Sequence, residues 1–112
     1  VIDGDIVYFS TSDSKVVYAM NIKDGTIAAE YPIYMNSFTK VIIDNGRLYV
    51  TSGDAYNNPG TGKFQVYKLG DSQNCVWELA LDTGGIFTTP LLADGIVYFG
   101  CEDGCLYAEE VK

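Results

Sequence analysis

Few side chains in this chain could carry out chemistry, and most of them are carboxylates in turns. Histidine is absent from the 112 residues, which excludes Ser-His-Asp triads, Cys-His pairs and imidazole metal sites built from this chain alone. The three cysteines, Cys75, Cys101 and Cys105, are fewer than the four ligands that a structural zinc site requires. No catalytic, cofactor-binding or metal-binding residue can therefore be assigned from the sequence.

Cys101 and Cys105 flank the turn 102–104 and are expected to face each other across a hairpin. They are the candidates for a disulfide, although a bridge closing so small a loop adds only about 2 kcal/mol and is strained in a hydrogen-bonded pair. The alternative is two small, half-buried thiols that fill positions beside the turn. Cys75 is left without a partner and is expected to pack near Trp77.

Oxygen-rich groups gather in three loops, and such loops can hold calcium. None has the spacing of an EF-hand loop, and turn chemistry alone explains Asp, Asn and Ser at these places. We therefore expect no calcium. The groups are Asp13 with Ser12 and Ser14, Asp54 with Asn57 and Asn58, and Glu102 with Asp103.

The elements that position these groups come from an internal repeat. Residues 1–9, 42–50 and 91–99 can be aligned so that each has an apolar pair, a turn dipeptide and a strand. Each is followed by a second strand, which contains Tyr18, Tyr67 or Tyr107. The anchoring tyrosines are 41 and then 49 residues apart: Tyr8, Tyr49 and Tyr98.

The longer interval is explained by an insertion rich in Gly, Asn and Pro between Tyr49 and Tyr67. Residues 53–62 replace the short turns that the other two repeats have at this point. An aromatic side chain among polar loop residues suits a contact with a partner, and an ordinary surface excursion is the alternative. The candidate partner loop comprises Asp54, Tyr56, Asn57 and Asn58.

Four strands per repeat are expected, at about 38–43, 47–51, 64–69 and 76–81 in the middle repeat. Helix signals are nearly absent. A period of 40 to 50 residues with four antiparallel strands is typical of a β-propeller blade. The sequence thus predicts an all-β partial propeller of about two and a half to three blades over residues 1–112: an incomplete blade at 1–33, a complete one at 38–81 and an incomplete one at 87–112.

The repeat resembles that of the quinoprotein-like, PQQ-type β-propeller family. The resemblance rests on residues 94–108, with strands ending in Val97-Tyr98 and Leu106-Tyr107-Ala108, and on residues 17–25. The family's tryptophan is present once, at Trp77, where a packing role between blades is expected instead of stacking on a quinone. The resemblance implies a propeller fold but no activity, since the repeat occurs in quinone-dependent dehydrogenases and in non-catalytic scaffolds.

The composition and net charge limit the classes of partner that this chain is expected to bind. The formal net charge is −8, so binding to nucleic acid or to anionic membranes is not expected, and no apolar run reaches the roughly 20 residues of a membrane-spanning helix. We expect a non-catalytic binding or scaffold segment whose loops contact a protein partner. The alternatives are a fragment of a quinone-dependent dehydrogenase and a subunit that completes a ring or filament with other copies. The resemblance implies an extracellular, cell-surface or periplasmic location.

Overall fold

The computed structural model describes residues 1–56 and 60–111, and every regular element in these ranges is a strand. The all-β prediction is confirmed: eleven antiparallel strands form three sheets of four, four and three strands. No helix of the length and apolarity that crossing a membrane requires occurs in the described residues.

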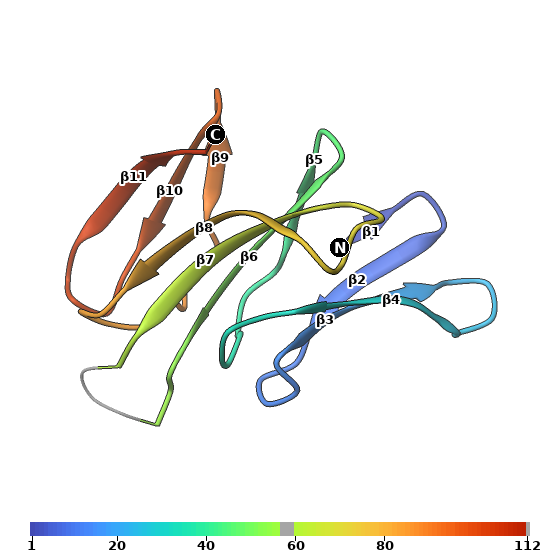
Figure 1. Cartoon of the computed structure of the whole chain (residues 1–112), viewed down its shortest axis with the longest axis horizontal. Coiled ribbons are helices and arrows are strands. Elements are labelled where there is room, and N and C mark those ends of the chain that lie inside the picture. The colour runs from blue at the N-terminus through green and yellow to red at the C-terminus, as the bar shows by residue number, and fades with distance from the viewer. Residues whose placement is uncertain (57–59, 112) are drawn as a thin grey trace.

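Each sheet is built from strands that are consecutive in the sequence (Figure 1). Sheet A contains β1 (Ile2–Asp3), β2 (Ile6–Ser10), β3 (Val16–Asn21) and β4 (Ile27–Pro32). Sheet B contains β5 (Ile42–Asp44), β6 (Arg47–Gly53), β7 (Gly62–Lys68) and β8 (Cys75–Leu81). Sheet C contains β9 (Leu91–Ala93), β10 (Ile96–Gly100) and β11 (Leu106–Glu110).

Tight turns join the strands where the sequence places Asn-Gly and Asp-Gly pairs. Asn45 and Gly46 have φ values of 49° and 75°, and Asp94 and Gly95 have 52° and 77°. Two consecutive positive φ values define the hairpin turn that matches the twist of antiparallel strands, and Asn, Asp and Gly are the residues that tolerate them.

The core lies between the sheets. We call the buried side chains between sheets A and B the A–B cluster, and those between sheets B and C the B–C cluster. The A–B cluster is Tyr8, Val17, Ala19, Tyr31, Ile33, Val41, Leu48, Val50 and Tyr67. The B–C cluster is Tyr49, Phe64, Val66, Ile86, Val97 and Phe99.

Sheet B is the central layer. Along β6, every residue from Leu48 to Gly53 is buried, whereas β2 and β10 alternate between buried and more exposed positions. Because successive side chains of a strand point to opposite faces, a strand buried at every position is covered on both sides. Sheet A and sheet C each bury one face against sheet B.

Two local predictions differ from the structure. The strand expected to start at residue 38 begins at Ile42, because Thr39 instead lies on an extended connector and its hydroxyl is 3.0 Å from that of Thr51. The hairpin β6–β7 is longer than its counterparts, pairing Gly53 with Gly62 beyond the pair Thr51–Phe64. As a result Tyr67 pairs with Leu48, whereas Tyr18 and Tyr107 pair with Phe9 and Phe99.

Candidate functional site

The turns and connectors that carry the predicted site residues gather at one edge of the three sheets. Strand direction reverses at every turn, so the β2–β3, β6–β7 and β10–β11 links and both connectors between sheets, 33–41 and 82–90, lie at the same strand ends. In Figure 1 the β2–β3 turn and the facing ends of β6 and β7 lie toward the lower side. We call this the loop edge.

Asn36 is the hub of the loop edge between sheets A and B. Its side chain is 2% exposed, and its Nδ2 donates to the Ser12 carbonyl at 2.5 Å and to Asp13 Oδ1 at 3.1 Å. Its Oδ1 accepts from the Ala55 amide at 3.3 Å. A backbone bridge joins Asn36 to Gly53. One buried amide thus connects the β2–β3 turn, connector 33–41 and the β6–β7 loop.

Tyr56 of the candidate partner loop also reaches sheet A. Its side chain is 75% exposed, yet its hydroxyl donates to Asp13 Oδ1 at 3.0 Å, and this hydrogen bond raises the pKa of Tyr56. Asp54 Oδ1 accepts from the Tyr56 amide at 2.9 Å. Asn57 and Asn58, the other predicted members, lie outside the described residues. The described part of this loop is therefore anchored to the β2–β3 turn by Asp13.

Asp103 accepts the hydrogen bonds that hold the β10–β11 turn, which we call the third turn. Its carboxylate accepts from the hydroxyls of Tyr107 and Thr83 at 2.5 and 2.7 Å and from the Cys105 amide at 2.9 Å. The hydrogen bond from Tyr107 is the main cause that lowers the pKa of Asp103 from 3.8 to about 2. Both Asp13 and Asp103 are thus engaged by donors of the protein itself.

The three cysteines are free thiols in the structure. Cys101 and Cys105 face each other beside the turn, with the Cys101 amide donating to the Cys105 carbonyl at 3.1 Å. Burial raises the pKa of the Cys101 thiol. Cys75 is exposed, and its Sγ lies 3.1 Å from the Trp77 carbonyl oxygen. The disulfide between Cys101 and Cys105 stays a prediction.

Trp77 packs against the B–C cluster, with its ring 5.8 Å from that of Phe64 in an edge-to-face arrangement.

Within residues 1–56 and 60–111, no group of three or more Cys, Asp or Glu side chains lies together in a way that could hold a metal ion.

An aromatic pair on the connectors, an exposed Phe38 and a half-buried Phe87, was not singled out from the sequence as a site. Phe38 and Phe87 lie at matching positions of connectors 33–41 and 82–90, and their rings meet edge to face at 5.4 Å. Phe38 is 55% exposed. Phe87 covers Gly85, where an added Cβ would lie 2.5 Å from the ring. The sequence carried a signal, because both residues precede a threonine in the repeat, but not their exposure.

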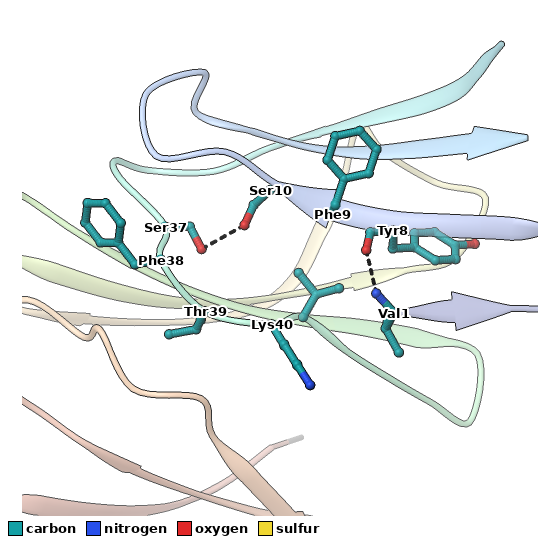
Figure 2. A pocket seen from close by; sticks show the side chains of 9 residues that line it. Val1, Tyr8, Phe9, Ser10, Ser37, Phe38, Thr39 and Lys40 are labelled. Atoms are coloured by element: carbon teal, nitrogen blue, oxygen red, sulfur yellow. Dashed lines mark hydrogen bonds between the residues drawn. The ribbon is translucent and has the colours of Figure 1, made fainter. Parts of the chain in front are cut away.

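A groove of about 330 Å³ adjoins this pair, between the end of β2 and connector 33–41. Figure 2 shows Phe38, Thr39 and Lys40 on one side of the groove and Phe9 and Ser10 on the other. The Ser10 and Ser37 hydroxyls, 3.2 Å apart, join the two walls. The groove thus offers aromatic surface, hydroxyls and the ammonium of Lys40.

No protein-family model matches this sequence, and no curated protein matches it either. The arrangement of the loop edge is therefore the main guide to function.

Proposed function

We propose that this chain is a non-catalytic binding and scaffold segment of a quinoprotein-like β-propeller, which contacts a protein partner through its loop edge. Three features support the propeller: consecutive antiparallel strands within each sheet, packing of each sheet face to face on the next, and equivalent connectors between them. Sheets A, B and C would be neighbouring blades. An exported or cell-surface location belongs to the same proposal.

The single observation that carries the binding role is the aromatic pair Phe38–Phe87 beside the groove. Exposed aromatic side chains are enriched where proteins bind one another, because they bury much apolar area with little loss of conformational freedom. Phe38 is 55% exposed, and the connectors that hold the pair are fixed by hydroxyl contacts such as Thr39–Thr51. A rigid, exposed aromatic surface is what a binding site requires.

The groove indicates the kind of segment that would bind. Its lining combines Phe9 and Phe38 with the exposed Lys40. An extended peptide with an apolar side chain for the aromatic surface and a carboxylate for Lys40 would match both features.

Panning a phage-displayed random-peptide library on the purified chain tests this function. We expect enriched peptides with an apolar and an acidic residue, and at least tenfold weaker binding of those peptides to Phe38→Ala and Phe87→Ala. Ile22→Ala, an exposed apolar residue in the turn at the opposite strand ends, is the matched control and should bind as the unaltered chain does. Absence of enrichment, or equal binding by the Phe38→Ala chain, would overturn the proposal.

A further inference from the structure

Sheets A and C each have one face that no other described part of the chain covers, and most side chains on both faces are apolar. On sheet A this face is formed by the side chains that point away from the buried Tyr8 and Val17. On sheet C it is formed by those opposite to Val97 and Phe99. The apolar members of the sheet A outer face are Ile2, Val7, Phe9, Tyr18 and Met20, and those of the sheet C outer face are Leu91, Ile96, Tyr98, Leu106 and Ala108. Each face also carries one carboxylate, Glu30 on sheet A and Glu110 on sheet C.

Strand register gives each outer-face residue a counterpart inside the molecule. Equivalent positions of β2, β6 and β10 are occupied by Ser10, Thr51 and Gly100. The residues that pair with them on the next strand are Val17, Phe64 and Leu106, respectively. Val17 and Phe64 are 0% exposed, in the A–B and B–C clusters, whereas Leu106 is 78% exposed. Sheet A buries this position against sheet B, and sheet B buries it against sheet C. On sheet C the same position is exposed to solvent.

The sheet A outer face shows the complementary relationship. Phe9 is 36% exposed, while its counterparts Val50 and Phe99 are 1% and 2% exposed. Ile2 pairs with Val7 as Ile43 pairs with Leu48; Ile2 is 66% exposed, and Ile43 packs against the A–B cluster. The exposed positions of sheet A are therefore equivalent to those that sheet B buries against sheet A and that sheet C buries against sheet B.

From these matches we infer that the sheet C outer face of one copy of this chain packs against the sheet A outer face of a second copy. The contact would repeat the A–B and B–C contacts. In both of these, the positions that are open on sheet C face the positions that are open on sheet A. Pairing of two identical faces has no counterpart in the molecule. The association is thus head-to-tail, and it leaves one face of each kind free for a further copy.

Charge should modulate this association. Each copy carries a net charge of −8, so two copies repel one another at low ionic strength, and salt screens this repulsion over distances of about 10 Å at 0.1 M. Raising the salt concentration should therefore strengthen association. Phe9 lines the groove of the proposed function as well as the sheet A outer face, whereas Ile2 and Leu106 do not line that groove. The Ile2 and Leu106 variants therefore let the inference and the proposed function fail separately.

Sedimentation equilibrium of the full chain and of two single-face variants tests the inference. Phe9→Lys alters the sheet A outer face and Leu106→Lys alters the sheet C outer face. Ile2→Lys is a second sheet A variant, used in case Phe9→Lys unfolds, since Phe9 also contacts the Tyr18 ring. Ile22→Lys introduces the same charge in an exposed turn and serves as control.

We expect the unaltered chain and Ile22→Lys to form species of multiples of 12.2 kDa, and each face variant alone to be a monomer. An equimolar mixture of Phe9→Lys and Leu106→Lys should form a one-to-one dimer, because each variant keeps the face that the other lacks. An unaltered chain that stays monomeric at about 1 mM would overturn the inference. Assembly retained by either variant alone would overturn it as well, because it would indicate pairing of identical faces or another surface.

Discussion

The hydroxyl of Tyr56 lies 3.0 Å from a carboxylate oxygen of Asp13, 43 residues away in the sequence. Asp13 belongs to the β2–β3 turn of sheet A, and Tyr56 belongs to the loop that extends from sheet B. Asn36 donates to the same oxygen from the connector. The inserted loop is therefore tied across the boundary between two sheets, and this tie places the exposed face of Tyr56 at the loop edge.

Replacing Asn36 by Ala should destabilise the protein by about 1–3 kcal/mol, because the three hydrogen bonds of a buried amide, one of them to a carboxylate, are lost. Urea unfolding monitored by circular dichroism measures the change. Asn74→Ala is the control, since Asn74 is exposed and, among the described residues, its side chain bonds only to Asp71 in its own turn. It should alter stability by less than about 0.5 kcal/mol. Equal effects of the two substitutions would show that Asn36 is not a hub.

Gly53→Ala should destabilise the protein by about 1–3 kcal/mol, because no room exists for a side chain. A Cβ at Gly53 would lie 2.6 Å from the Gly85 Cα, which is backbone and cannot move aside alone. At Gly100 the nearest atom would be 3.5 Å away, so Gly100→Ala is the matched control and should leave the melting temperature almost unchanged. A Gly53→Ala chain as stable as this control would contradict the close approach of connector 82–90 to β6.

Asp103 should give the third turn an acid sensitivity. Its pKa is lowered from 3.8 to about 2 in the folded protein, so its stabilising effect is present above about pH 4 and is lost as the pH falls through about 2. The stability difference between the unaltered chain and Asp103→Asn should therefore shrink between pH 4 and pH 2. Tyr107→Phe removes the shortest hydrogen bond to Asp103 and should shift this loss to higher pH.

Glu30→Gln changes one exposed carboxylate and controls for the general effect of charge. A difference between the unaltered chain and Asp103→Asn that stays constant from pH 5 to pH 2 would contradict the described hydrogen bonds.

The thiols should differ in reactivity. Three free thiols should titrate in denaturant, and in the native protein Cys75 and Cys105 should be alkylated faster than Cys101, whose pKa is raised by burial. Peptide mapping by mass spectrometry after a short iodoacetamide pulse measures the order. Recovery of one free thiol only would instead support the candidate bridge between Cys101 and Cys105.

The strands could be predicted from the sequence because apolar alternation and turn dipeptides are local signals. Asn45-Gly46 and Asp94-Gly95 fix their hairpins by backbone preference alone. The register of Tyr67 could not be predicted in the same way, since alignment by residue type places it with Tyr18 and Tyr107. The longer β6–β7 hairpin shifts it by two residues, and only strand pairing reveals this shift.

The candidate site was less accessible to sequence analysis. Asp13 and Tyr56 could be noted as loop residues, but their contact depends on how sheets A and B pack. Asn36 gave no signal, because a buried amide in a connector looks like any polar loop residue until its partners are known. The exposure of Phe38 likewise follows from its connector and not from its repeat position.

The central claim is that sheet B lies between sheets A and C with a fixed choice of facing side chains. An aromatic NOE spectrum tests it most directly. We predict cross-peaks between the rings of Tyr31 and Tyr67 and between those of Phe64 and Phe99, whose centroids are 5.5 and 5.3 Å apart, and none between Phe9 and Phe64. Absence of either predicted cross-peak in a folded sample, or a Phe9–Phe64 cross-peak within one chain, would contradict the stacking described here.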